Sequence, residues 1–307
     1  MRKTAAPDPA RPGSLRRETR ERLRAHAVRP RRSRGQSFLV APGIARRIVA
    51  AADAGVGGLA QALAVEIGPG AGALTAPLLD RAAHLLAIEV DPRLLALLRE
   101  RFGDRPNVTW TLGDATAYPF ETEVPRLAAG RPACVVANLP YAAGTPILLR
   151  LLDCGGILQT LIVMLQREVA ERITAPPGGK AYGALTLAVA AHACARRLFT
   201  VPPSAFHPRP AVTSAVLEIV PHREPPGPPA EWPAVSALVR AAFGRRRKTL
   251  RQSLAGPATG LTPGRAQAAL AAAGIDPRRR GETLTLAEFH RLARAVGPAG
   301  IPPVDDA

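Results

Sequence analysis

The chain contains only three cysteines in 307 residues, has no long apolar run and carries little acidic charge. Cys134, Cys154 and Cys194 lack the spacing of a metal site, which suggests small buried residues in a reducing cytoplasm. No run approaches the roughly 18 apolar residues of a membrane span. The basic N-terminus lacks the apolar stretch of a secretory signal. These absences predict a cytoplasmic protein without a metal centre or a membrane segment.

Basic residues are abundant instead, and they are unevenly distributed. The formal net charge is +17, and residues 1–34 alone hold twelve Lys/Arg against three acids. Further clusters are Arg245-Arg246-Arg247-Lys248 with Arg251, and Arg278-Arg279-Arg280. Such clusters are typical of phosphate contacts and predict a nucleic-acid partner. The alternative is a solvated basic surface in an arginine-rich proteome.

The middle of the chain alternates between apolar strand patterns and helix patterns. Residues 63–67, 85–90, 108–112, 134–138 and 161–165 are the expected strands, and residues 73–81, 92–102 and 146–152 are helices between them. Alternation of this kind predicts an α/β fold with a parallel sheet covered on both faces.

The pattern changes after Gln166. Helices are expected at 167–174 and 182–194, followed by two adjacent strands, 197–201 and 214–220, that suggest an antiparallel end to the sheet. A proline-rich stretch then precedes four helices at 232–243, 246–254, 263–273 and 286–296. The expected organisation is a basic extension (1–34), a catalytic domain (35–221), a linker (222–230), a helical domain (231–297) and a disordered tail (298–307).

Candidate ligand-binding residues follow three successive strands. Gly68, Gly70 and Gly72 follow the first strand, Glu89 ends the second, and Asp114 follows the third. Ligands of open parallel sheets bind beyond the carboxyl ends of the strands. A glycine loop admits a ligand to the backbone, and an acid can accept from ribose hydroxyls or from an adenine amino group. The loop with Glu89 also fits dinucleotide binding, but Asp114 has no place in that pattern.

The run Asn138-Leu139-Pro140-Tyr141 follows the fourth strand and carries the most specific chemistry. An adenine amino nitrogen is a poor nucleophile because its lone pair is delocalised into the ring. Acceptors at the Asn138 side chain and the Leu139 carbonyl would favour a pyramidal nitrogen, Pro140 would stiffen the loop, and Tyr141 could stack on the base. The alternative is an ordinary strand-to-loop turn with a packed tyrosine.

Taken in order, the motifs resemble those of the ribosomal RNA adenine N6-methyltransferase family, particularly its small-subunit type. The likeness extends from about residue 15 to residue 297. The motifs that carry it are Gly35–Leu39, Glu66–Gly70, Glu89–Asp91, Asn138–Tyr141, Leu165–Val169, Lys180–Gly183, Val201–Pro208 and Ala242–Leu250.

This resemblance implies a Rossmann-like seven-stranded methyltransferase sheet with a small α-helical C-terminal domain, and a monomeric enzyme. It implies transfer of two methyl groups from S-adenosylmethionine (SAM) to each of two adjacent adenines near the 3′ end of 16S rRNA in the small ribosomal subunit. The implied cofactor residues are Ser37, Leu39, Gly68, Gly70, Glu89, Asp114 and Asn138. Tyr141 and Phe206 are implied to lie on opposite faces of the target base, and Arg245, Arg246, Arg247, Lys248 and Arg251 to bind RNA.

Two residues depart from the family pattern. Ser37 stands where the family usually has asparagine, and Arg34 stands where it usually has an apolar residue. The departures leave open a large-subunit adenine methylase that confers antibiotic resistance. A non-catalytic ribosome-assembly factor is a further alternative, although Asn138, Tyr141, Glu89 and Asp114 are all intact. A DNA adenine methylase is disfavoured because its tetrapeptide usually has two central prolines.

Overall fold

The computed structural model describes residues 14–30, 36–245 and 247–297, so the expectations for Arg34, Arg246 and the tail lie outside the described residues. The chain divides into two compact units. The first comprises the described residues up to Ala170 together with Arg196–Pro221, and the second comprises Glu171–Ala195 with the described residues from His222 onward. The division assigns 171–195 to the same unit as the C-terminal helices, whereas the sequence suggested a catalytic domain continuous over 35–221.

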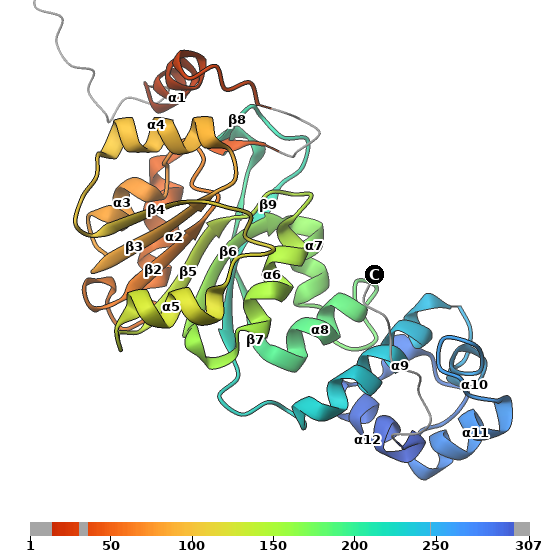
Figure 1. Cartoon of the computed structure of the whole chain (residues 1–307). Coiled ribbons are helices and arrows are strands. Elements are labelled where there is room, and N and C mark those ends of the chain that lie inside the picture. The colour runs from red at the N-terminus through yellow and green to blue at the C-terminus, as the bar shows by residue number, and fades with distance from the viewer. Residues whose placement is uncertain (1–13, 31–35, 246, 298–307) are drawn as a thin grey trace, which may run out of the picture. The chain divides into compact units, whose positions relative to one another are not determined.

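A seven-stranded sheet organises the first unit (Figure 1). Its strand order is β4-β3-β2-β5-β6-β9-β7, in which β2 to β6 are parallel neighbours and β9 runs antiparallel to β6. The bounds are β2 Leu63–Ile67, β3 His84–Glu89, β4 Val108–Leu112, β5 Ala133–Asn138, β6 Thr160–Gln166, β7 Ala193–Val201 and β9 Ser214–Pro221. The register sets Ile67 opposite both Ile88 and Ala137, so the carboxyl ends of the central strands lie level.

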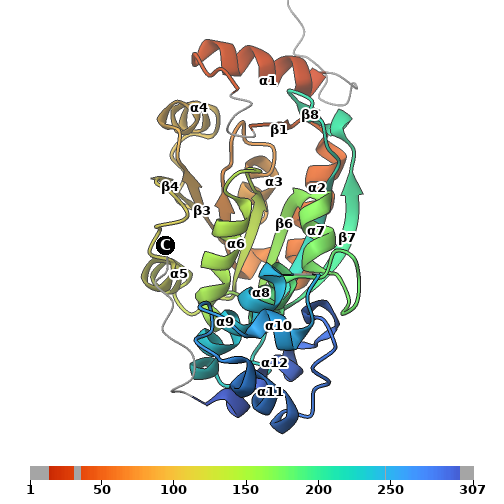
Figure 2. The same cartoon turned by 90° about the vertical axis from the view of Figure 1, so that its right-hand side faces the viewer.

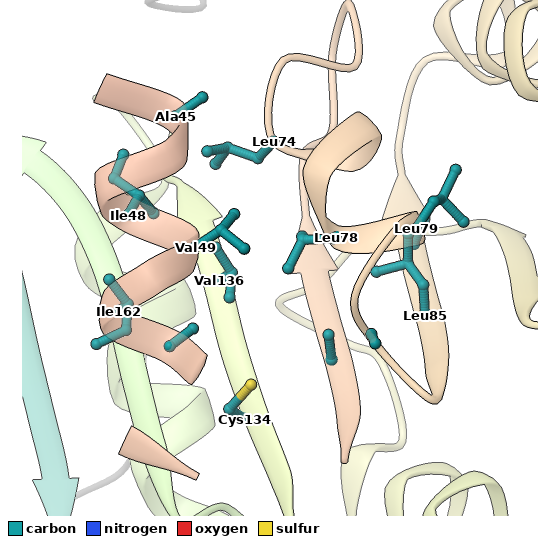
Figure 3. Close-up of a cluster of buried hydrophobic side chains, with 14 of the residues drawn as sticks. Ala45, Ile48, Val49, Leu74, Leu78, Leu79, Leu85, Cys134, Val136 and Ile162 are labelled. Carbon is teal, nitrogen blue, oxygen red and sulfur yellow. The ribbon is translucent and has the colours of Figure 1, made fainter. Parts of the chain in front are cut away.

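Helices cover both faces of this sheet because its central strands are mostly apolar and are buried on both faces. On one face, α2 (Pro42–Gly55), α3 (Thr75–Leu79) and α4 (Pro92–Phe102) share a buried cluster with the strands. Figure 3 shows Ile48 and Val49 of α2 beside Val136 and Ile162 of the strands. Full burial of such a side chain contributes about 1.5–3 kcal/mol each. The other face carries α5 (Phe120–Ala128) and α6 (Gly144–Asp153) (Figure 1).

A two-stranded antiparallel sheet lies beside the main one. It pairs β1 (Phe38–Leu39) with β8 (Phe206–His207), so that Leu39 faces Phe206. The short helix η4 (Pro203–Ala205) leads into β8. Helix α1 (Ser14–Ala25) packs against α4 and buries Leu23 in a cluster with Phe38, Ala71, Leu94 and Leu97.

The second unit is helical and has its own core. Its helices are α8 (Ala184–His192), α9 (Trp232–Gly244), α10 (Leu250–Leu254), α11 (Pro263–Ala272) and α12 (Leu286–Val296). Phe289, Leu238, Leu250 and Leu270 are all fully buried there. Tyr182, from one of the family-like motifs, donates its hydroxyl to the Leu284 carbonyl at 2.7 Å. Helix α7 (Arg167–Ile173) passes from the first unit into the second.

Several local expectations were wrong. The helix expected over 246–254 begins only at Leu250, and Thr249 precedes it as the capping residue. Helix α5 was not expected at all. Cys134 and Cys154 are buried as expected, but Cys194 is exposed.

No helix in the described ranges is both long and apolar enough to span a bilayer. The same ranges contain no group of three or more His, Cys, Asp or Glu residues placed to hold a metal.

Candidate active site

A cavity of about 470 Å³ opens at the carboxyl ends of β2, β3, β4 and β5 in the first unit. Its size falls within the range of small-molecule sites. It brings together ten of the residues expected from the sequence: Ser37, Leu39, Gly68, Gly70, Glu89, Asp114, Asn138, Leu139, Pro140 and Tyr141. Phe206 is not among the lining residues.

The glycine loop forms one wall of the cavity. Gly68 and Gly70 have φ of +64° and +58°, a left-handed conformation that side chains disfavour. A Cβ on Gly70 would also approach the Phe38 ring to 2.9 Å. Arg101 of α4 donates to the Ala71 carbonyl at 2.7 Å and holds the end of the loop. The loop therefore requires glycine at position 70 for two independent reasons, the left-handed backbone and the closeness of the Phe38 ring.

Glu89 is fixed by the backbone around it. Its Oε2 accepts from the Gly70 N–H at 3.1 Å, and its Oε1 accepts from the N–H groups of Val90 and Asp91 at 2.9 and 3.0 Å. The side chain is buried, and burial raises its pKa although these bonds act in the opposite direction. A carboxylate offers about four acceptor positions. Three are occupied, which leaves capacity for one more strong bond.

Asp114 offers a freer carboxylate. Its Oδ1 accepts from the N–H and hydroxyl of Thr116 at 2.9 and 2.8 Å, and these bonds lower its pKa. The side chain is exposed and ionised, and Oδ2 has no hydrogen-bond partner in the described part of the chain. Val90, also a lining residue, is 59% exposed and adds an apolar surface beside it.

Asn138 is oriented by a main-chain contact. Its Nδ2 donates to the Ser37 carbonyl at 3.3 Å, and its Oδ1 accepts no hydrogen bond from the described residues. The Leu139 N–H donates to Met164 at 3.1 Å, and the Leu139 carbonyl accepts no hydrogen bond from the described residues. Tyr141 is half-buried, and its hydroxyl lies 3.2 Å from the Ser214 hydroxyl. The tetrapeptide thus presents two acceptors beside an aromatic ring.

Phe206 departs from the expectation that it lies open to a base. It is only 1% exposed and belongs to the core beneath α2 and α3. Its pairing with Leu39 across β1 and β8 explains this burial, because the pair closes the edge of the core. In this conformation the ring offers no face for stacking.

Glu66 lines the cavity and was not among the expected cofactor residues. It is 1% exposed within β2, and its Oε2 has no hydrogen-bond partner in the described ranges. Burial raises its pKa to about 8, so the carboxyl is largely protonated at neutral pH. A single acid in an otherwise apolar strand was the signal available in the sequence.

The basic segment of the second unit is exposed. Arg245, Arg247, Lys248 and Arg251 make no ion pair with any described residue. The other arginine cluster differs from the expected phosphate site, because Arg278 pairs with Asp276 at 3.2 Å and Arg279 pairs with Glu288 at 2.6 Å. Of that cluster, only Arg280 lacks an acidic partner among the described residues.

Comparison with known proteins agrees with this geometry. The family model for ribosomal RNA adenine dimethylase matches residues 27–296. A protein from Geobacter sulfurreducens named ribosomal RNA small subunit methyltransferase A is 40% identical to this chain, over 91% of this chain and 99% of its own length. The one from Pelotomaculum thermopropionicum is 44% identical over 92% of this chain and 96% of its own length.

Solved structures show the same fold. A dimethyladenosine transferase from Plasmodium falciparum superimposes with a TM-score of 0.71 at 23% identity, over 86% of this chain and 98% of its own. The 23S rRNA methyltransferase ErmE superimposes with a TM-score of 0.62 at 24% identity, over 84% and 98%. The family match covers most of the chain and includes every residue of the cavity. The chain therefore belongs to the ribosomal RNA adenine dimethylase family and is an rRNA adenine methyltransferase.

Proposed function

We propose that this enzyme uses SAM to dimethylate the N6 groups of two adjacent adenines near the 3′ end of 16S rRNA, during assembly of the small subunit. The observation that carries the proposal is the tetrapeptide at the end of β5, where Asn138 is oriented by its amide nitrogen and its Oδ1 has no partner in the described part of the chain. The relatives named for the small subunit, matched over nearly their full length, support the choice of RNA.

The cavity suits SAM in size and in the chemistry of its donors and acceptors. The glycine loop at Gly68 and Gly70 would admit the methionine portion close to the backbone, and Glu89 would accept from a ribose hydroxyl. Asp114 would accept from the adenine amino group, with Val90 against the ring. When bound, SAM supplies an electrophilic methyl group.

The protein's own part in the reaction is positioning. Asn138 Oδ1 and the Leu139 carbonyl would accept hydrogen bonds from the two N–H groups of the target amino group and stabilise the charge that develops on its nitrogen. Tyr141, anchored at Ser214, would stack on the purine. No titrating base is needed at the nitrogen, so the work is done by orientation and electrostatics. The adenine must leave its stack to enter, as in other base-modifying enzymes.

The test is methyl transfer to purified subunits. Small and large ribosomal subunits from cells lacking the modification are incubated with the enzyme and labelled SAM, and the labelled nucleotides are mapped. We expect label only in the small subunit, on two adjacent doubly methylated adenines. Label confined to the large subunit would overturn the choice of RNA and favour the resistance-type activity.

A further inference from the structure

Helix α1 lies against the wall of the cavity. Its Leu23 is 2% exposed and packs with Phe38, Ala71 and Leu94, three residues that also line the cavity. Near the N-terminal end of the same helix, Arg16 donates to the carbonyls of Ser204 and Phe206 at 2.6 and 3.2 Å. Figure 2 shows α1 running above α4 and β8. The helix is therefore a fixed part of the rim of the site.

The charges on α1 are only partly neutralised within the helix. Residues 14–30 contain six arginines against two glutamates. Both glutamates are engaged, Glu21 by Arg17 at 2.8 Å and Glu18 by Arg22. The side chains of Arg20 and Arg24 are exposed and make no hydrogen bond or ion pair with a described residue.

The two unpaired arginines, Arg20 and Arg24, share one flank of the helix with Arg16. Arg16, Arg20 and Arg24 are spaced four residues apart, which places them in one row. The hydrogen bond from Arg16 to the Phe206 carbonyl fixes this row beside β8. The pKa of His207 in β8 is lowered mainly by burial, and the positive charges of Arg16 and Arg20 lower it further. Arg209, also exposed and without an ion pair among the described residues, follows β8 and adds to the same positive region.

We propose that Arg20 and Arg24 of α1 contact the phosphate backbone of the substrate RNA close to the adenine that enters the cavity. The proposal rests on the proposed function for the identity of the RNA. The helix would then hold the RNA through arginine–phosphate contacts made by the first unit itself. These contacts would add to those proposed for the basic segment of the second unit. RNA phosphates are a suitable partner because arginine pairs strongly with them.

The experiment compares two double variants of the full chain. R20Q/R24Q removes the proposed contacts. R81Q/R105Q removes the same charge from exposed arginines that precede the amino ends of β3 and β4, at the opposite edge of the sheet from the cavity. Binding to unmethylated small subunits is measured over a range of salt concentrations, together with SAM affinity and melting temperature.

We expect R20Q/R24Q to weaken binding and to lower the log–log salt slope by about 1.4–1.8, or about 0.7–0.9 for each lost phosphate contact. SAM affinity and melting temperature should stay at the wild-type values, as should every measurement on R81Q/R105Q. A slope equal to that of wild type, or an equal loss in both variants, overturns the proposal. If the wild type methylates only the large subunit, the proposed function fails and the same measurement on that subunit tests α1.

Discussion

Polar groups in the cavity and basic residues of the second unit are organised in opposite ways. Glu89 and Asn138 are each held by backbone groups, which fix the direction of every remaining acceptor. Arg247 and Arg251 are exposed and unpaired among the described residues, so they can adapt to a partner. Chemistry on a small group requires preorganisation, whereas a phosphate chain can be held by mobile charges. The comparison predicts that single substitutions matter most in the cavity.

The largest effect is expected at Asn138. Asn138→Ala removes one preorganised acceptor and should lower single-turnover methyl transfer on the order of 10²–10³-fold, with a much smaller loss of SAM affinity. Asn107→Ala is the matched control, because Asn107 also donates to a backbone carbonyl, that of Leu79 at 3.1 Å, but lies outside the cavity. Rates within threefold of wild type would refute the role of Asn138.

Glu89→Ala should weaken SAM binding roughly ten- to a hundredfold, since a hydrogen bond to a charged group contributes about 1.5–3 kcal/mol. It should also lower the melting temperature, because the Gly70 N–H loses its acceptor. Asp91→Ala is the control: it removes the cap of α4 but keeps the backbone N–H that donates to Glu89, and Asp91 does not line the cavity. Calorimetry should find a SAM affinity near wild type in that control. Equal SAM affinity in both variants would contradict the assignment of Glu89.

Glu66 should make the stability of the unliganded enzyme depend on pH. Its folded-state pKa is raised from 4.5 to about 8 by burial. The folded state then binds more protons than the unfolded state in this window, so stability falls as pH rises from about 4.5 to about 8. The slope contributed is at most about 1.4 kcal/mol per pH unit. Denaturant unfolding of Glu66→Gln should show a flatter pH profile, and parallel profiles for both proteins would exclude the effect.

In the second unit the comparison can be made between two pairs of arginines. R247Q/R251Q removes unpaired charges and should lower the salt slope of subunit binding by about 1.4–1.8 without changing the melting temperature. R278Q/R294Q removes the same charge from residues paired with Asp276 and Glu231. That variant should lower the melting temperature slightly and keep the slope. The reverse pattern would indicate that Arg247 and Arg251 brace the helical unit instead.

The smallest effect is expected at Ser37. Its observed contact with Asn138 is made by the carbonyl, so the side chain is not needed for it. Ser37→Asn should therefore tighten SAM binding or leave it unchanged in a calorimetric titration. A marked loss would show that the cavity has been remodelled around serine.

The main sheet could be predicted from sequence because each parallel strand is a short apolar run. The bounds of β2 and β4 match the prediction. Helix α5 was missed because Pro125 and its charged residues obscure the helical pattern. Strands β1 and β8 have two residues each, and their pairing depends on a contact between distant parts of the chain that no local pattern encodes.

The residues that line the cavity were predicted better than the partners of the charged side chains on the surface. Residues that follow strand ends could be found because parallel strands align their carboxyl ends. The sequence could not show that backbone N–H groups occupy most of the acceptor capacity of Glu89, or that Arg279 is neutralised by Glu288. It also could not show that Phe206 is turned into the core. These properties depend on side-chain directions, which are fixed by packing.

The pairing of Leu39 with Phe206 has a consequence for synthesis of the chain. The ribosome must add every residue between the two before β1 can find its partner. At about 5–20 residues per second this interval lasts roughly 10–30 seconds. Until then Phe38 lacks the partner strand that holds it beside Gly70, and this wall of the cavity is incomplete. A newly made molecule of this enzyme therefore completes the wall of its cavity only after β8 has been synthesised.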